Sequence, residues 1–392
     1  MGNHISIKER ELSVSRNEEA TGGVAVPLMV EGKESFSYVS GIRTKNLMGI
    51  SDIAIRLNAG ITVIHGENGT GKTAILKALY CATKPLWFRQ DVDPKRTKSK
   101  LEEAVVEKIK YVFRPDRGMI GRMVNQHSAE KALKIELKYD DGSRTELSWG
   151  RQASEHIGMV SGIKSQSSEV IYIPPKEIIS TSENFVSLYK SYQMAFEETY
   201  YDLLEMLDMP EKKALDQTLA KEIVDRLSSL IGGRVIKRDK QYYVVDSENV
   251  EYEMGLLSEG FRKIAMLLRL IDNGSLRKGS LLIWDEPESN MNPKMIEPLV
   301  DVLCLLVKMG VQIVLASHDY FIQQELQLRA EYMDEAGFIL SVSFVSLYYD
   351  GDMIRAEQSD RAYKLENNAI MNEFDAIYDR EQERIDSVVG GG

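Results

Sequence analysis

The chain has 392 residues, with 49 Lys or Arg and 60 Asp or Glu, so its formal net charge is −11. This balance argues against a generally basic nucleic-acid binder, although a local basic groove is compatible with it. Cys81 and Cys304 lie far apart in apolar patterns, which is typical of buried thiols in a reducing compartment and not of a disulfide framework or metal site. No apolar run of about 18 residues and no signal-peptide pattern occurs, so we expect a cytoplasmic protein without a membrane span.

The first hundred residues combine a polar segment with the start of a strand and helix pattern. Residues 1–34 are polar apart from the patch "GVAVPLMV" and predict a flexible or extended N-terminal arm. The stretch "ISDIAIRLNAGITVIHG" predicts two strands around a turn at 58–60. The second strand, 61–65, leads through a glycine-rich loop into a helix from about Lys72 to Tyr80. We assign residues 35–100 to the first lobe of an α/β core.

Residues 101–250 have the pattern of a hairpin and helical lobe inserted into that core. A helix is predicted over 100–113, hairpins in "LKIELKYDDGSRTELSW" and "RVIKRDKQYYVV", and a short buried strand in "EVIYIPP". Ser180 and Glu183 have capping-box spacing, which predicts a helix start. One helical face then carries an apolar stripe, which favours core packing: Phe185, Leu188, Tyr189, Tyr192, Phe196 and Tyr200. Pro210 ends this helix, and a second helix follows with Leu215, Leu219, Ile223 and Leu227.

The core pattern resumes over residues 251–345, and we assign 346–392 to a C-terminal tail. A helix in "LLSEGFRKIAMLLRLIDNG" closes at Gly274, and Asn292-Pro293 starts another helix that ends at Gly310. The segments "SLLIWDEPE" and "VQIVLASHD" are buried strands that end in polar residues. Strands that alternate with helices and end in this way predict a largely parallel sheet with its ligands at the carboxyl edge.

A phosphate-binding loop is the strongest motif in the chain. It matches the pattern G-x-x-x-x-G-K-[ST] in full, after a predicted strand and before a predicted helix. Backbone N–H groups of such a loop converge on phosphate oxygens, and the helix N-terminus adds partial positive charge. Lys72 can reach the β- and γ-phosphates, and the Thr73 hydroxyl can bind Mg²⁺. The predicted ATP-binding residues are Gly66, Glu67, Asn68, Gly69, Thr70, Gly71, Lys72, Thr73 and Ala74.

Three further motifs follow in an order that suits the same chemistry. Asp285 and Glu286 end a buried strand, where Asp285 suits Mg²⁺ and Glu286 suits polarising the attacking water. Ser258, Glu259 and Gly260 open a helix and form either a second anion site or a plain N-cap. Two chains facing head-to-tail would each offer this helix end to the γ-phosphate held by the other. His318 follows a buried strand, where it either senses the γ-phosphate or is an ordinary polar histidine.

This order resembles the ABC-type ATPase heads of the RecF and SMC group, and within it the ATP-binding proteins similar to OLD (overcoming lysogenization defect) ATPases. The segments that carry the resemblance are "GENGTGKT", "YIPPKEIIS", "LLSEGFRK", "WDEPESNMNP" and "ASHDYF". The resemblance implies a P-loop NTPase fold, ATP and Mg²⁺ as ligands, and a homo-oligomer built on a head-to-tail dimer. It implies that Lys72 and the loop backbone bind phosphate, and that Thr73 and Asp285 serve the metal.

The same resemblance implies the remaining roles. Glu286 is then the catalytic carboxylate, Ser258 and Gly260 form the signature that closes on the partner's ATP, and His318 is the switch histidine. Asn290 and Asn292 stand where the family has its D-loop. The signature lacks the Gly-Gly-Gln ending of transporter ATPases, and no Q-loop glutamine is evident near 172–180. Long heptads are absent from the insertion, which counts against coiled-coil arms.

Two enzyme functions and one non-enzymatic function are compatible with these motifs. The first is an ATPase subunit of an antiphage system that controls a separately encoded effector, such as a nuclease or toxin, because the segment after residue 345 is too short for the TOPRIM nuclease domain of OLD proteins. The second is a RecF-like DNA maintenance ATPase, which the basic clusters "PKRTKSK" and "RVIKRDK" favour. The third is a scaffold that binds ATP and barely hydrolyses it, against which Glu286 argues.

Overall fold

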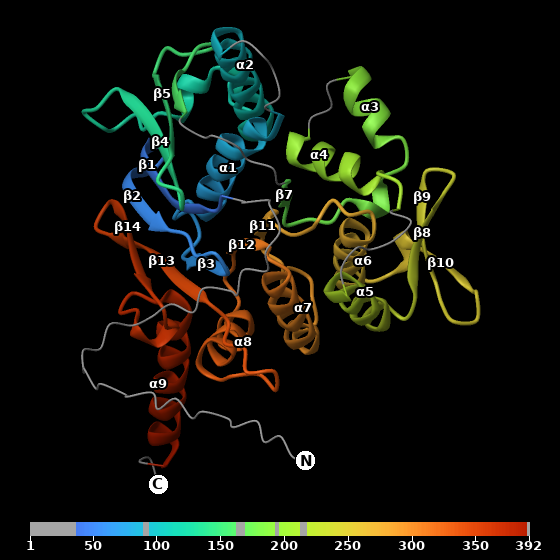
Figure 1. The fold of residues 1–392 in the computed structure, drawn as a ribbon. Helices are drawn as coiled ribbons and strands as arrows, with labels where there is room; N and C mark the ends of the chain where they lie inside the picture. The colour runs from blue at the N-terminus through green and yellow to red at the C-terminus, as the bar shows by residue number, and fades with distance from the viewer. Residues whose placement is uncertain (1–36, 89–93, 162–168, 193–195, 212–217, 390–392) are drawn as a thin grey trace, which may run out of the picture. The chain divides into compact units, whose positions relative to one another are not determined.

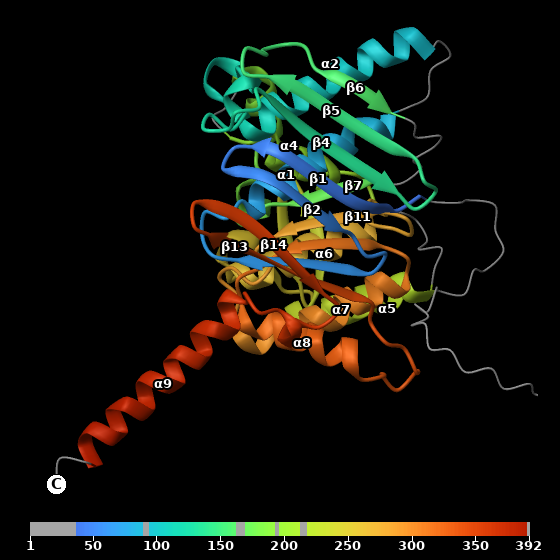
Figure 2. The ribbon, with the colours of Figure 1, turned by 90° about the vertical axis from the view of Figure 1, so that its left-hand side faces the viewer.

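The computed structural model describes residues 37–88, 94–161, 169–192, 196–211 and 218–389, which are built around three β-sheets (Figures 1 and 2). The predicted N-terminal arm and Leu215 lie outside these residues. Phe36–Gly392 form one unit in the pattern of chain contacts. Within the described residues, none of the helices combines the length and the apolar character that crossing a membrane requires.

The central sheet has six strands in the order β14-β13-β3-β12-β11-β7. All neighbouring pairs are parallel except β13 and β14, so the predicted largely parallel sheet is confirmed. Every residue of β3, β7, β11 and β12 is buried, because both faces of the sheet are covered. The strands are β3 (Ile61–Gly66), β7 (Val170–Ile173), β11 (Leu281–Asp285), β12 (Gln312–Ala316), β13 (Val342–Asp350) and β14 (Met353–Ser359).

Helices and a second sheet cover one face of the central sheet. Ile64 and Ile283 point into this core, which a five-stranded antiparallel sheet closes on its far side. The helices are α1 (Lys72–Thr83) and α2 (Pro94–Phe113). The strands of the second sheet are β1 (Val39–Leu47), β2 (Ile50–Arg56), β4 (Ala132–Tyr139), β5 (Arg144–Gly150) and β6 (Gly158–Ser161). The predicted helix after the glycine-rich loop and the first predicted hairpin, β4–β5, are confirmed.

A helical layer covers the opposite face, where alternate residues such as Ile61 and Trp284 join a second core. The helices are α3 (Phe185–Tyr192), α4 (Glu198–Leu207), α5 (Thr218–Ile231), α6 (Glu259–Asp272), α7 (Ile296–Lys308) and α8 (Tyr320–Glu331). A small sheet of β8 (Arg234–Arg238), β9 (Gln241–Val245) and β10 (Glu251–Glu253) contains the second predicted hairpin. Helix α9 (Ala369–Val389) ends the described chain and extends away from the sheets (Figure 2).

Two parts of the predicted organisation differ in the structure. Strand β7 falls within the segment predicted as an insertion, yet it forms one edge of the central sheet beside β11. Strands β13 and β14 extend past residue 345 and form the other edge, so residues 346–359 of the predicted tail belong to the central sheet. The segment 101–250 therefore contributes to the sheet that carries the predicted motifs.

The predicted aromatic helix is wrong as one continuous element. Two helices, α3 and α4, replace it, because Glu197 has an extended backbone with φ −70° and ψ 144°. The predicted capping box is also wrong: the Ser180 hydroxyl donates to Glu177, and α3 begins only at Phe185. The Phe185 ring packs against Phe196, with 5.2 Å between the ring centroids. Phe185 is buried in the core and Tyr189 and Tyr200 pack against it, whereas Leu188 and Phe196 are exposed, so the predicted core stripe is only partly confirmed.

Candidate functional site

The glycine-rich loop joins β3 to α1 and has the backbone that its sequence requires. Gly66 and Gly71 have φ values of 148° and 90°, in the region that favours glycine. A Cβ on Gly66 would lie 2.1 Å from the Leu347 carbonyl oxygen, and one on Gly71 would lie 2.8 Å from Ile50 Cδ1. Neither position has room for a side chain. The loop therefore passes close to β13 and β2 and presents its backbone at the start of α1, as expected for a phosphate cradle.

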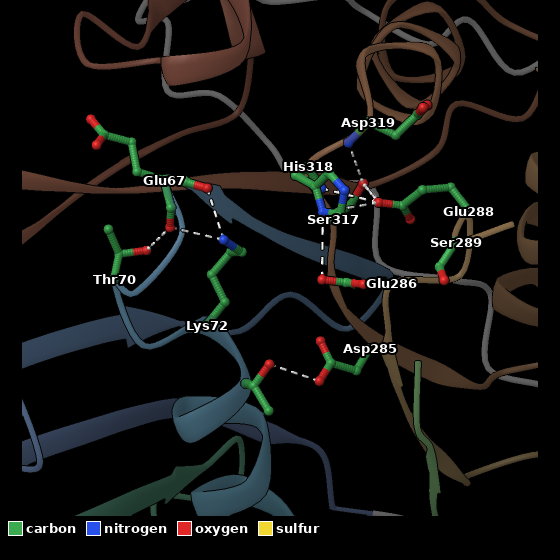
Figure 3. Close-up of polar contacts among 12 residues, drawn as sticks. Glu67, Thr70, Lys72, Asp285, Glu286, Glu288, Ser289, Ser317, His318 and Asp319 are labelled. Carbon is green, nitrogen blue, oxygen red and sulfur yellow. Dashed lines mark hydrogen bonds and ion pairs between the residues drawn. The ribbon is translucent and has the colours of Figure 1, made fainter. Parts of the chain in front are cut away.

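Lys72 is buried at the mouth of this loop (Figure 3). Its Nζ donates to the carbonyl oxygens of Gly66 at 2.8 Å and of Glu67 at 3.0 Å. Burial lowers the pKa of Lys72, and the carboxylates of Glu286 and Asp285 oppose that effect. Glu67, Asn68 and Gly69 are exposed at the tip of the loop, and Ala74 is half-buried in the first turn of α1. The ammonium group is thus fixed inside a curve of backbone whose outer rim is open to solvent.

Thr73 and Asp285 meet across the gap between α1 and the end of β11. The Thr73 hydroxyl donates to Asp285 Oδ2 at 2.8 Å, and the Tyr172 hydroxyl donates to the same oxygen at 3.1 Å. Burial raises the pKa of Asp285, while these two hydrogen bonds lower it. Sequence reasoning missed Tyr172, although it lies in the predicted strand "EVIYIPP", which pairs with β11. A hydroxyl and a carboxylate at this point are the hard oxygen donors that Mg²⁺ prefers.

Glu286 and His318 lie at the ends of neighbouring strands, β11 and β12. His318 Nδ1 is 3.5 Å from Glu286 Oε1 and 3.8 Å from Glu288 Oε1 (Figure 3). The side chains of His318 and Glu286 are 52% and 32% exposed, so both can meet a ligand. Glu286 has a φ of 50°, in the left-handed region that non-glycine residues rarely adopt. Such strained positions cluster at functional sites. Glu286 and His318, two of the three predicted catalytic residues with Lys72, therefore lie side by side.

Two buried charged residues that the motif analysis did not single out support this corner of the site. Glu288 Oε1 accepts hydrogen bonds from Ser317 Oγ at 2.9 Å and from the His318 backbone N–H at 3.1 Å. Lys263, on α6, donates from Nζ to the carbonyl oxygens of Glu286 at 3.1 Å and of Ser289 at 2.8 Å. Burial raises the pKa of Glu288 and lowers that of Lys263. Lys263 thus binds backbone carbonyl groups of the loop after β11, and Glu288 binds a backbone N–H of the loop after β12.

The predicted signature residues stand apart from this cluster. Ser258 caps α6 by accepting a hydrogen bond from the Phe261 N–H at 3.4 Å, and Glu259 accepts one from Asn290 Nδ2 at 3.0 Å. Among the described residues, Ser258, Glu259 and Gly260 make no hydrogen bond or ion pair with the phosphate-binding loop. Ser258 is exposed, and the nearby Leu256 is 80% exposed. The tip of α6 is therefore accessible from solvent. In the described structure, this motif does not bind the phosphate-binding loop of the same chain.

Comparisons with known proteins agree with this architecture. A family model described as "AAA domain, putative AbiEii toxin, Type IV TA system" matches residues 161–322. A crystal structure of an Smc head bound to the C-winged-helix domain of ScpA is similar over 82% of this chain and 97% of that chain, with 11% identity and a TM-score of 0.52. The SMC head domain from Thermotoga maritima is similar over 82% of this chain and 98% of that chain, with 12% identity and a TM-score of 0.44.

No curated protein sequence matches the chain. The matched family segment holds the ends of β11 and β12 and the start of α6, whereas the phosphate-binding loop lies outside it. The likeness to the Smc head bound to ScpA shows that the chain is an α/β protein with the fold of an ABC-type ATPase head like those of SMC proteins.

Proposed function

We propose that the chain is an ATP-binding and ATP-hydrolysing subunit that dimerises around ATP and controls a separately encoded effector in antiphage defence. The observation that carries the ATPase part is the meeting of Lys72, the Thr73–Asp285 pair and the Glu286–His318 pair at the carboxyl ends of three adjacent strands. A glycine-rich turn without a role in nucleotide binding would not be expected to lie beside both a hydroxyl–carboxylate pair that suits Mg²⁺ and a carboxylate–histidine pair.

The geometry supports hydrolysis of ATP by water to ADP and phosphate. The loop backbone and Lys72 would bind the β- and γ-phosphates and stabilise the charge that builds on their oxygens. Glu286 is exposed enough to accept a proton from the attacking water, and the nearby His318 would contact the γ-phosphate. Thr73 and Asp285 would hold Mg²⁺, which supplies further charge neutralisation when it is bound. Tyr172 fixes one Asp285 oxygen from β7.

The dimeric part of the proposal rests on the signature helix. Ser258 stands at the N-terminus of α6, where free backbone N–H groups and the helix dipole favour an anion. Because Ser258 is exposed and, in the part of the chain that the structure describes, makes no hydrogen bond or ion pair with the phosphate-binding loop, a second copy facing it head-to-tail would receive this tip over its own ATP. Two such contacts, related by a two-fold axis, would close the dimer or a unit of a higher oligomer.

The effector part is supported by the description of the matched family. That description names a toxin of a toxin–antitoxin system. We propose that ATP-driven opening and closing of the heads restrains or releases a nuclease or toxin encoded separately.

The alternative, a RecF-like DNA-binding ATPase, is supported only by the two basic clusters of the sequence. In the second basic cluster, Lys237 pairs with Asp208 and Arg238 pairs with Glu251, so these cations are not a free surface for phosphates. The side chains of 94–97, in the first cluster, lie outside the described residues.

Turnover and assembly of the purified chain test the ATPase proposal together. We expect Mg²⁺-dependent release of phosphate from ATP that Lys72→Ala abolishes, and an ATP-dependent dimer by light scattering that Ser258→Arg prevents. Turnover that is equal in the wild type and Lys72→Ala would refute it. The defence role is tested by plaque assays with the native operon, where Lys72→Ala should remove protection. Full protection by that variant would contradict a role for ATP in control of the effector.

A further inference from the structure

We propose that Glu288 is a positioning residue that fixes His318 beside Glu286, and that it is not a second catalytic carboxylate. This inference rests on the proposed ATPase function and adds a residue to that site. Two residues separate Asp285 from Glu288, and all the carboxylates in this segment lie close to His318 or Lys72, so the sequence alone does not say which one activates water. The hydrogen bonds and the exposure of each side chain separate their roles.

Glu288 is already engaged by protein groups. Its Oε1 accepts two hydrogen bonds, from the Ser317 hydroxyl and from the His318 N–H, and its side chain is only 6% exposed. The other oxygen, Oε2, is buried and has no hydrogen-bond partner among the described residues. Both carboxylates lie near His318 Nδ1, Glu286 Oε1 at 3.5 Å and Glu288 Oε1 at 3.8 Å, but the side chain of Glu286 is 32% exposed. Glu286 can therefore meet a water molecule on a phosphate, whereas Glu288 is turned to the loop that follows β12.

Other hydrogen bonds hold that loop to β3 and to the start of α8. The Ser317 N–H donates to the Ile64 carbonyl oxygen at 3.0 Å, and Ser317 Oγ accepts from the Asp319 N–H at 3.1 Å. Asp319 in turn caps α8 by accepting from the Ile322 N–H. These bonds tie residues 317–319 to β3 and α8. Glu288 adds the link to the loop after β11, on which Glu286 stands.

Loss of this link would free His318 relative to Glu286 without removing either catalytic side chain. A displacement of about 1 Å in a reacting group can reduce a rate roughly a hundredfold, so a lost anchor is expected to lower kcat more than ATP affinity. Glutamine offers a direct control. It keeps a carbonyl oxygen for both donors, and its NH₂ would replace Oε2, which makes no hydrogen bond that could be lost.

The experiment compares Glu288→Gln, Glu288→Ala, Ser317→Ala and Glu286→Gln in the full chain, with ATP as the probe. We expect Glu288→Ala to lower kcat by roughly tenfold or more with KM changed by less than about threefold. Glu288→Gln should keep most of the wild-type kcat, and the kcat of Ser317→Ala should lie between those of Glu288→Gln and Glu288→Ala. The Glu288→Ala/Ser317→Ala double variant should be no slower than Glu288→Ala alone. Glu169→Ala is the matched control, because Glu169 is equally buried but pairs with Lys84 at the start of β7.

Two outcomes would overturn the inference. Glu288→Gln as slow as Glu286→Gln would make Glu288 a catalytic carboxylate, and Glu288→Ala at the wild-type rate would leave it without a role. If Glu288→Ala does not fold, Glu288→Gln and Ser317→Ala still decide between these roles.

A spectroscopic measurement separates failure of this inference from failure of the proposed function. In protein labelled with ¹³C and ¹⁵N histidine, the His318 imidazole signal is assigned by its absence in His318→Asn. We expect this signal to shift or broaden in Glu288→Ala and to stay near the wild-type position in Glu288→Gln. An unchanged signal in Glu288→Ala refutes the positioning role even if the chain hydrolyses ATP. Equal turnover of the wild type and Lys72→Ala would refute the ATPase proposal and leave this test valid.

Discussion

Lys263→Met removes the buried ammonium group that joins α6 to the loop carrying Glu286. The Lys263 side chain is fully buried, and its Nζ donates to the carbonyl oxygens of Glu286 and Ser289. Methionine fills a similar volume but leaves both oxygens without this donor. The Glu286 oxygen keeps one donor, because it also accepts from the Ser289 N–H at 3.1 Å, so only the Ser289 oxygen is orphaned, at a cost of about 1–3 kcal/mol. Removing a buried ammonium group, whose pKa burial lowers, returns part of that cost. We expect a net loss of about 1–2 kcal/mol in the free energy of unfolding.

The loss of activity should exceed what this destabilisation explains. Glu286 has a φ of 50°, and a non-glycine residue in that region is strained by roughly 1–2 kcal/mol. Lys263 binds the carbonyl oxygen of Glu286 itself, so its removal allows the backbone to relax and the carboxylate to turn away. We expect kcat to fall roughly tenfold or more at a temperature where the variant is still folded.

Urea unfolding followed by circular dichroism and steady-state phosphate release measure the two effects separately. Lys221→Met is the matched control, because Lys221 is an exposed lysine on α5, and it should change neither quantity. A Lys263→Met variant with wild-type stability and wild-type kcat would show that the hydrogen bonds to Glu286 and Ser289 contribute nothing measurable. Lost stability with an unchanged kcat would refute only the link to Glu286.

Three other changes have defined outcomes. Glu286→Gln should lower kcat by roughly 10²–10⁴-fold and should trap an ATP-dependent dimer that light scattering detects; a monomer with normal turnover would contradict the role of this carboxylate. Gly66→Ala should lower the midpoint of urea unfolding, because its Cβ would lie 2.1 Å from the Leu347 carbonyl oxygen, and an unchanged midpoint would refute the steric argument. Glu198 shares Lys108 with Asp202, and burial raises its pKa from 4.5 to about 7. The folded state then holds a proton that the unfolded chain has lost, so stability should fall as pH rises from about 4.5 to 7, by roughly 1–3 kcal/mol, and Glu198→Gln should remove this slope in urea titrations.

The phosphate-binding loop was predictable because its chemistry is local. The positions that need glycine, and the lysine and threonine that follow, are set by eight contiguous residues between a strand and a helix. Gly66 and Gly71 occupy the conformations that this reasoning requires. The adjacency of Asp285 and His318 to the loop also followed from the alternation of strands and helices, since parallel strands end at one edge of a sheet.

The break between α3 and α4 was not predictable in the same way. No Gly or Pro interrupts residues 185–209, and the apolar spacing continues through the break. The extended backbone at Glu197 turns the chain so that rings of the two helices meet: Phe185 contacts Phe196, and Tyr189 stacks on Tyr201 with 4.9 Å between ring centroids. Tertiary contacts here override the helical preference of the local sequence.

The supporting residues of the site were hidden for a related reason. Tyr172, Lys263 and Glu288 act on groups that are distant in sequence or lie in another loop, so no local pattern reveals their partners. One signal was present for Lys263, which shares the spacing i, i+3, i+4, i+7 with Met266, Leu267 and Leu270 on the buried face of α6. A lysine on an apolar helix face must find acceptors, and here the strand-end loop provides them.

The supports of Glu286 and His318 share one property that bears on the chemistry. Lys263 binds the backbone carbonyl oxygen of Glu286, and Glu288 binds the backbone N–H of His318. Neither support uses the carboxylate of Glu286 or the imidazole nitrogens of His318 in a hydrogen bond of its own. Because Lys263 and Glu288 fix Glu286 and His318 through backbone groups, the reactive side-chain atoms stay available for water and phosphate. The charged groups of Lys263 and Glu288 themselves are buried. A site organised in this way can exclude solvent from its supports and still admit substrate at its exposed tips.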